Sequence, residues 1–196
     1  KHNEPLDDAL FAFDTQGSQA VNSLAALMSG GGGGGGGRQA HPLENQPVPP
    51  IELPTLQGQP FRLADVKAGV VVLDFWATWC PPCREGLPHI QAIHDWAKRE
   101  GLSVAVYAVN VGETEREVQA FWNEQGYTMP VLMDQQTKVA GAYGVQGIPQ
   151  TVVIADGKVQ HVHVGYNPAM ENQLKSEIQS LLSQSATPPP APSGAQ

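Results

Sequence analysis

An almost uninterrupted apolar run, Val70–Trp76, lies just ahead of the tetrapeptide Cys80-Pro81-Pro82-Cys83, which holds the only two cysteines of the chain. A short apolar run of this kind predicts a strand with both faces covered. Proline is favoured in the first turn of a helix, so we expect a helix to begin at about Pro81. The sequence therefore predicts that a buried strand delivers Cys80 to the N-terminus of a helix.

This position determines the expected chemistry of Cys80. A helix N-terminus carries unpaired backbone N–H groups and the positive end of the helix dipole, and both favour a thiolate. We therefore expect a lowered pKa for the Cys80 thiol. Cys83 lies one helical turn along, where its thiol can attack a mixed disulfide on Cys80 and release the partner in reduced form. The motif predicts thiol-disulfide exchange, with Cys80 as the nucleophile and Cys83 as the resolving thiol.

Metal binding and a purely structural disulfide are two simpler explanations of the cysteine pair. A zinc site usually has four Cys or His ligands, and the chain has no third cysteine. The candidate histidines are His89, His94, His161 and His163. The last two share a face of an expected strand but lie far from the cysteines in sequence. A disulfide across so short a loop would constrain little unfolded-state entropy. We therefore expect neither a metal site nor a structural disulfide.

Charge and hydropathy argue against two classes of partner. The chain has 11 basic and 19 acidic residues, a formal net charge of −8 and no basic cluster, which argues against a nucleic-acid surface. No run approaches the ~20 apolar residues of a membrane-spanning helix. The chain begins with Lys1 and has no basic-then-apolar leader, so we expect a processed or shortened form whose signal or anchor lies outside it.

Composition divides the chain into four segments. Residues 1–29 contain one short amphipathic pattern, and we expect an accessory helix or the remnant of a preceding domain. Residues 30–50 begin with eight glycines and continue with a proline-rich stretch, which predicts a linker. Residues 51–184 carry the pattern of a folded domain. Residues 185–196 are rich in proline and small polar residues, which predicts a disordered tail.

Strand and helix patterns alternate between 51 and 184 and close on an antiparallel hairpin, which predicts an α/β sandwich with a mixed sheet. The expected strands are 51–53, 59–63, 70–76, 102–111, 131–133, 151–154 and 159–164. The expected helices are 81–100, 114–125 with a capping box of Thr114 and Glu117, 137–143, and a last helix with Asn167 as its cap and Pro168 at its first position.

Two motifs together give the chain a family resemblance. Phe75-Trp76-Ala77-Thr78-Trp79-Cys80-Pro81-Pro82-Cys83 with Pro88, and the distant Gly147-Ile148-Pro149-Gln150-Thr151, resemble the thioredoxin superfamily. The early hairpin, the Thr-Trp-Cys form of the motif and the extra helix and strand at 114–133 are more similar to its TlpA/ResA-type extracytoplasmic branch. The resemblance implies a thioredoxin-like three-layer sandwich with a central mixed β-sheet, helices on both faces, an N-terminal hairpin and an inserted helix and strand.

The resemblance also implies roles for Pro149 and Asp74. Pro149 would have a cis peptide bond and lie against the cysteine pair. Asp74 would take up and return the proton of Cys83, and burial in an apolar strand would raise its pKa. The alternative is that Asp74 faces solvent at a strand edge. TlpA/ResA-type proteins commonly carry a glutamate three residues after the second cysteine, where this chain has Gly86. Glu85 is one residue early and about 100° around the helix, so Asp74 is our candidate acid.

The remaining expectations concern the residues that contact the substrate and whether the protein reduces or oxidises it. We expect Trp79, Pro81, Pro82 and Ile148 to contact the substrate. Ile148 before Pro149 resembles reducing thioredoxins, and the motif lacks the histidine of strongly oxidising relatives. The expected function is reduction of protein disulfides through the redox-active Cys80–Cys83 disulfide, with no other cofactor.

The resemblance implies partners and a location as well. We expect protein disulfide or dithiol substrates, a membrane or soluble thiol electron donor, a monomer and a place outside the cytoplasm, periplasmic or membrane-tethered, with cytochrome c maturation as one role. Two alternatives stay open. A thiol peroxidase would carry a threonine three residues before the reactive cysteine, where this chain has Ala77, with Thr78 one residue late. A noncatalytic binding module with the thioredoxin fold would not need the cysteine pair.

Overall fold

The structure is a computed structural model of the chain, and it describes residues 40–185. The expected N-terminal segment, the glycine run and residues 186–196 of the expected tail lie outside the described residues. No helix within 40–185 is long and apolar enough to cross a membrane.

Strands and helices alternate along the described chain. The strands are β1 Glu52–Pro54, β2 Pro60–Arg62, β3 Val70–Trp76, β4 Val104–Val111, β5 Val131–Asp134, β6 Gln150–Ala155 and β7 Lys158–Val164. The helices are the 3-10 helix η2 Leu63–Asp65 and the α-helices α2 Pro81–Arg99, α3 Glu115–Gln125, α4 Lys138–Ala142 and α5 Met170–Ser185. Every strand and α-helix expected between 51 and 184 is present, with small shifts at the ends.

The main sheet has five strands in the order β5-β4-β3-β6-β7. The central strand β3 runs parallel to β4 and antiparallel to β6. The outer strands continue this division, because β5 is parallel to β4 and β7 is antiparallel to β6. β1 and β2 form a separate antiparallel hairpin. The expected mixed sheet and early hairpin are confirmed.

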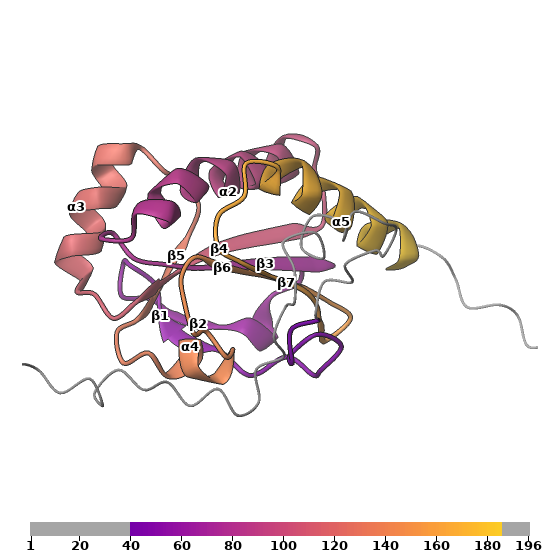
Figure 1. The fold of residues 1–196 in the computed structure, drawn as a ribbon, viewed down its shortest axis with the longest axis horizontal. Coiled ribbons are helices and arrows are strands. Elements are labelled where there is room, and N and C mark those ends of the chain that lie inside the picture. The colour runs from indigo at the N-terminus through magenta and orange to yellow at the C-terminus, as the bar shows by residue number, and fades with distance from the viewer. Residues whose placement is uncertain (1–39, 186–196) are drawn as a thin grey trace, which may run out of the picture. The chain divides into compact units, whose positions relative to one another are not determined.

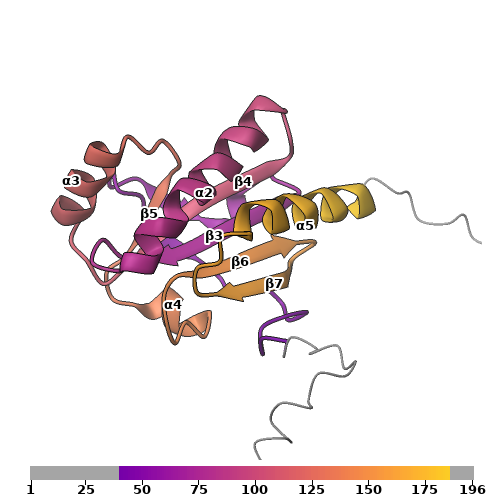
Figure 2. The ribbon, with the colours of Figure 1, turned by 45° about the horizontal axis from the view of Figure 1, so that its top comes forward.

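Two layers cover the faces of this sheet (Figure 1). On one face, apolar residues of α2, α3 and α5 form a single buried cluster with alternate residues of β3. On the other face, α4 and the β1–β2 hairpin pack against the remaining residues of β3. Figure 2 shows α2 and α5 lying over the same face of the strands. The full burial of β3 follows from this arrangement, since both of its faces are covered.

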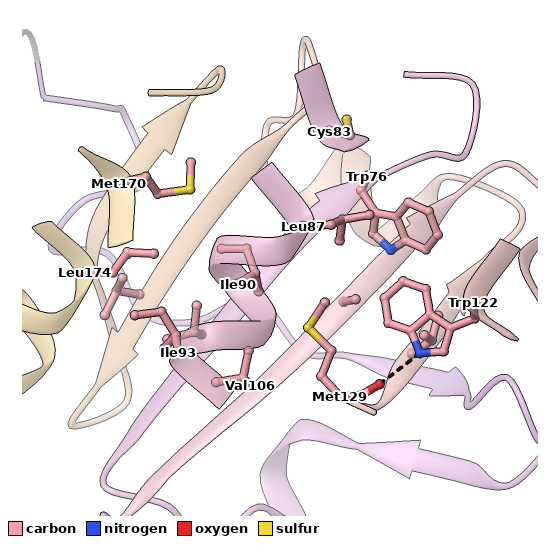
Figure 3. Packing of buried hydrophobic residues seen from close by; sticks show 14 of the residues in the cluster. Trp76, Cys83, Leu87, Ile90, Ile93, Val106, Trp122, Met129, Met170 and Leu174 are labelled. Carbon is pink, nitrogen blue, oxygen red and sulfur yellow. Dashed lines mark hydrogen bonds between the residues drawn. The ribbon is translucent and has the colours of Figure 1, made fainter. Parts of the chain in front are cut away.

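The core under α2 extends to the cysteine pair (Figure 3). Cys83 and Leu87 of α2 belong to the same buried cluster as Trp76 of β3. The rings of Trp76 and Trp122 lie 5.0 Å apart, centre to centre. The Trp122 indole N–H donates a hydrogen bond to the Met129 carbonyl oxygen at 3.3 Å. Burial of each such side chain contributes about 1.5–3 kcal/mol, so this packing fixes the first turns of α2 on the sheet.

The last helix begins at Met170, two residues later than the expected start at Pro168. The Asn167 side-chain oxygen accepts a hydrogen bond from the Ala169 N–H at 2.9 Å. The Met170 N–H donates to the Asn167 carbonyl oxygen, also at 2.9 Å. Asn167 therefore makes the side-chain contact expected of a cap, but it closes a turn ahead of the helix, which starts two residues later than expected.

Residues 40–50, which we expected to be part of a linker, contact the folded domain. The Asn45 N–H donates a hydrogen bond to the Val159 carbonyl oxygen at 2.7 Å, on the edge strand β7. The buried Tyr143 hydroxyl donates to the Pro49 carbonyl oxygen at 2.9 Å. Part of the β7 edge is therefore covered by the chain that precedes β1.

Candidate active site

The turn between β3 and α2 carries the nucleophile candidate. The Cys80 N–H donates to the Ala77 carbonyl oxygen at 3.3 Å, which closes a turn at the end of β3. Cys80 is the N-cap of α2, as expected, and its Sγ accepts a hydrogen bond from the Cys83 N–H at 3.2 Å. The sulfur therefore faces the N–H groups that are free at the start of a helix.

Cys80 and Cys83 form a disulfide, with their Cα atoms 5.2 Å apart. Cys80 retains 3% of its accessible surface and Cys83 retains none. Trp79, directly before Cys80, is 69% exposed and stands beside the pair. Pro81 and Pro82 are exposed in the first turn of the helix. The disulfide therefore reaches solvent through Cys80, between exposed apolar neighbours.

The loop before β6 lies against Cys80. The Ile148–Pro149 peptide bond is cis, as expected. The Ile148 carbonyl oxygen is 3.6 Å from Cys80 Sγ, and Ile148 is partly buried against both core clusters. The Gly165 N–H donates to the Pro149 carbonyl oxygen at 2.8 Å, which ties this loop to the end of β7. The structure thus brings together the two motifs that are about 70 residues apart in the sequence.

Asp74 lies in the middle of β3 and is 2% exposed, so the alternative that it faces solvent at a strand edge is wrong. Side chains alternate along a strand, and the neighbours Val72 and Trp76 belong to the cluster under α2. Asp74 therefore faces the layer that carries Cys83. Its carboxylate accepts one hydrogen bond, from the Thr151 hydroxyl at 2.8 Å. Burial raises the pKa of Asp74 to about 7, and the Thr151 bond lowers it only in part.

Gly86 takes the helix position at which TlpA/ResA-type proteins commonly carry a glutamate. A Cβ at Gly86 would lie 3.6 Å from the Tyr166 ring, so the tyrosine covers this part of the helix. The Tyr166 hydroxyl is 3.3 Å from His89 Nε2, and His89 Nδ1 is 3.1 Å from a Glu171 oxygen. Glu85 is exposed. Asp74, in contrast, is a buried acid on the face of the sheet that carries Cys83.

The candidate histidines are dispersed. His163 Nε2 lies 2.8 Å from Glu177 Oε2. The rings of His163 and His161 are stacked, with their centres 6.4 Å apart. His89 lies on the α5 side of α2, as described above. In the part of the chain that the structure describes, no group of three or more His, Cys, Asp or Glu side chains could hold a metal ion.

The sequence reasoning missed Glu113. This residue lies just beyond β4, is 9% exposed and contacts Thr78 in the turn that precedes Cys80. The feature that could have identified Glu113 from the sequence was its place just after an expected strand. β3 and β4 are parallel, so their carboxyl ends lie at one edge of the sheet, and polar residues there converge.

Known proteins share this fold and motif. The redoxin family matches residues 43–178. Thiol-disulfide oxidoreductase ResA of Geobacillus thermodenitrificans is 34% identical over 134 residues, which cover 68% of this chain and 75% of that protein. The structure of a thioredoxin-family thiol:disulfide interchange protein of Chlorobium tepidum has a TM-score of 0.58 and 30% sequence identity. That match covers 69% of this chain and 95% of the Chlorobium chain.

A third relative is the exposed lipoprotein thioredoxin Etrx1 of Streptococcus pneumoniae. Its structure has a TM-score of 0.58 and 28% identity, and the match covers 67% of this chain and 99% of that chain. The redoxin match spans the part of the chain that holds the cysteine pair, the cis-proline loop and the five-stranded sheet. The chain belongs to the redoxin family, within the thioredoxin superfamily, and is a TlpA/ResA-type thiol-disulfide oxidoreductase.

Proposed function

We propose that the protein reduces disulfide bonds of other proteins, with Cys80 as the nucleophile and Cys83 as the resolving thiol. The observation that carries this assignment is the placement of Cys80 Sγ at the N-cap of α2, 3.2 Å from the Cys83 N–H. The same N–H would stabilise a Cys80 thiolate in the reduced protein. Cys80 also keeps accessible surface, whereas Cys83 has none.

The exchange has two balanced steps. The Cys80 thiolate attacks one sulfur of a substrate disulfide, forms a Cys80–substrate bond and releases the other substrate sulfur as a thiolate that takes up a proton. Cys83 then loses its proton, attacks Cys80 Sγ and displaces the second substrate sulfur. The substrate gains two electrons and two protons, and the protein is left with the Cys80–Cys83 disulfide that the structure contains.

Asp74 is the proposed acceptor of the Cys83 proton. It faces the α2 layer, and its pKa of about 7 permits it to take up and return a proton near neutral pH. No charged partner competes for it, since its one hydrogen bond in the described structure comes from the Thr151 hydroxyl. These properties support a role in the second step, when Cys83 must become a thiolate.

The substrate would lie over the exposed apolar rim of the disulfide. Trp79, Pro81 and Pro82 are the exposed residues of this rim. The partly buried Ile148 lies against Cys80 from the cis-proline loop, in which Pro149 itself is buried. Proline lacks an N–H group, so the loop at Pro149 leaves neighbouring backbone groups free to pair with an extended substrate. This rim suits a polypeptide segment next to a disulfide, and the proposed chemistry needs no metal or further cofactor.

The reduction potential of the Cys80–Cys83 pair tests whether the protein acts as a reductant. Ile148 before Pro149 and the absence of histidine from the motif support a reductant, and potentials in the superfamily range from about −270 to −120 mV. Titration of Cys80–Cys83 in glutathione buffers should give a value nearer the lower limit, and the wild type should reduce insulin disulfides while Cys80→Ser should not. A potential near the upper limit would instead indicate an oxidant.

We further propose that the protein acts outside the cytoplasm, as a monomer that receives electrons from a membrane or soluble thiol donor. The supporting relatives are named ResA and, in one case, an exposed lipoprotein thioredoxin. Trapping of substrates on Cys83→Ser, which stalls at the mixed disulfide, would identify the partners and show whether apocytochromes c are among them. Exclusive recovery of cytoplasmic proteins from intact cells would contradict the location.

A further inference from the structure

The turn that presents Cys80 is held from the neighbouring strand by one side chain. Residues 77–80 form a turn closed by the Cys80 N–H and the Ala77 carbonyl oxygen. Thr78, the first inner residue of this turn, donates its backbone N–H to Glu113 Oε2 at 2.7 Å. The Thr78 hydroxyl donates to the other carboxylate oxygen, Glu113 Oε1. Glu113 therefore accepts hydrogen bonds from both donor groups of Thr78.

A third donor fixes the carboxylate itself. Asn110, the register partner of Trp76 near the end of β4, donates its side-chain N–H to Glu113 Oε2 at 2.7 Å. Asn110 has no accessible surface and Glu113 has 9%. Between them, Gly112 has a φ of +78°, a conformation that glycine adopts without steric cost. The chain thus turns after β4 and places the Glu113 carboxylate under the turn of residues 77–80.

This arrangement differs from ordinary helix capping. Thr114 and Glu117, at the start of α3, form the expected capping box with each other and are exposed. Glu113 lies directly before them in sequence, but the three groups that donate hydrogen bonds to it belong to β4 and to the turn 35 residues earlier. Its hydrogen bonds therefore join two segments of the site and do not serve the helix.

We propose that Glu113 is a positioning residue for thiol-disulfide exchange, which sets the orientation of the turn that carries Trp79 and Cys80. The inference rests on the proposed function, because it assigns a role within that same site. A carboxylate with two occupied oxygens fixes Thr78 in one place, and Thr78 is joined directly to the exposed Trp79 and then to Cys80. Small misplacements of reacting groups lower a reaction rate by large factors. The hydrogen bonds between Glu113 and Thr78 therefore matter for the approach of a substrate disulfide to Cys80 Sγ.

The test compares Glu113→Ala with the conservative variant Glu113→Gln. In Glu113→Gln, the amide oxygen can accept hydrogen bonds from the Thr78 N–H and from Asn110, and the amide N–H can donate to the Thr78 hydroxyl. This variant therefore keeps the hydrogen bonds to Thr78 and removes the charge. We expect Glu113→Ala to lower kcat/KM for insulin reduction about 10-fold or more and Glu113→Gln to stay within about threefold of the wild type. Glu117→Ala is the matched control, because it removes a neighbouring glutamate that does not contact the turn.

Two readouts report on the turn without a protein substrate. The first is the rate of iodoacetamide alkylation of Cys80 in the reduced protein across pH. The second is acrylamide quenching of Trp79, obtained as the difference between each variant and the same variant with Trp79→Phe. Glu113→Ala should change both profiles, while Glu113→Gln and Glu117→Ala should leave them close to the wild type. Failure of the wild type to reduce insulin would refute the proposed function alone, since these two readouts would still decide the role of Glu113.

A second variant distinguishes loss of the Thr78 contact from a general folding defect. Thr78→Val removes only the hydroxyl half of the contact, and its combination with Glu113→Ala should be no slower than Glu113→Ala alone, because both remove the same interaction. The inference is overturned if folded Glu113→Ala matches the wild type in alkylation and quenching. It is also overturned if Glu113→Gln is as slow as Glu113→Ala, or if the Thr78→Val effect simply adds to that of Glu113→Ala.

Discussion

Two buried carboxylates, one within β3 and one just beyond the neighbouring strand β4, have different surroundings. Asp74, within β3, is enclosed by apolar residues and accepts a single hydrogen bond from Thr151. Glu113, just beyond β4, accepts three, from two groups of Thr78 and from Asn110. Burial with few partners disfavours a charged carboxylate, which suits Asp74 to proton exchange. The oxygens of Glu113 are instead occupied by fixed donors. The number of partners, more than burial itself, separates the acid proposed for chemistry from the acid proposed for positioning.

The largest expected effect is on the pH dependence of stability. The folded-state pKa of Asp74, about 7, lies above its ordinary value of 3.8, so ionisation favours the unfolded chain. Its contribution to stability is therefore full below about pH 4 and is lost as pH rises through 7, by as much as about 4 kcal/mol. In the oxidised protein, the free energy of unfolding of Asp74→Asn relative to the wild type should rise from pH 4 to pH 8. A flat difference, measured by urea denaturation, would contradict this account of Asp74.

The next largest effect is on turnover. Removal of the proton acceptor in Asp74→Asn should slow resolution of the mixed disulfide about 100-fold near pH 7. Stopped-flow measurement on a preformed Cys80 mixed disulfide isolates this step. Glu113→Gln is the comparison, because it neutralises the other carboxylate and should have a much smaller effect on the same step. Equal rates for Asp74→Asn and the wild type would remove Asp74 from the mechanism.

A smaller effect is expected on stability when Glu113 loses its carboxylate. Glu113→Ala leaves the Thr78 N–H and the Asn110 amide without their acceptor, which should cost about 1–3 kcal/mol. Thermal unfolding of the oxidised protein measures the loss. An unchanged stability would mean that the Glu113 carboxylate does not hold Thr78 and Asn110 as proposed.

The smallest effect is expected from Glu117→Ala, which removes the reciprocal contact with Thr114 at the start of α3. The exposed capping box lies outside the turn of residues 77–80, so we expect a small loss of melting temperature and an unchanged alkylation profile of Cys80. An alkylation profile changed as much as that of Glu113→Ala would show that general loosening of α3, and not the Thr78 contact, controls the site.

Local patterns were sufficient to predict most of the fold. Val70–Trp76 is a strand because its apolar run fits a sheet covered on both faces, and the helix after it starts at Pro81 because proline suits the first turn. Thr114 and Glu117 were predictable because a capping box lies within four residues of sequence. The cysteine pair and the cis bond before Pro149 were likewise carried by short motifs.

Contacts between distant segments were not predictable in this way. The Thr78 partner of Glu113 is 35 residues away, and the Thr151 partner of Asp74 is 77 residues away. Both pairs form only when strands are placed side by side in the sheet. Residues 40–50 resembled a linker because their composition is rich in proline, and composition does not show which edge backbone groups will accept their hydrogen bonds. The later start of α5 has a local cause instead, because the Met170 N–H bonds to the Asn167 carbonyl oxygen and closes a separate turn before the helix begins.

The unequal chemistry of the two thiols is the central feature of the proposed mechanism. Reduced protein should be alkylated with iodoacetamide at a series of pH values, and the modified cysteine should be identified by mass spectrometry. We predict that Cys80 reacts with an apparent pKa well below the ordinary thiol value of ~8.5, while Cys83 remains protected until far higher pH. Equal reactivity of the two thiols, or faster reaction of Cys83, would contradict the assignment of Cys80 as the nucleophile and Cys83 as the resolving thiol.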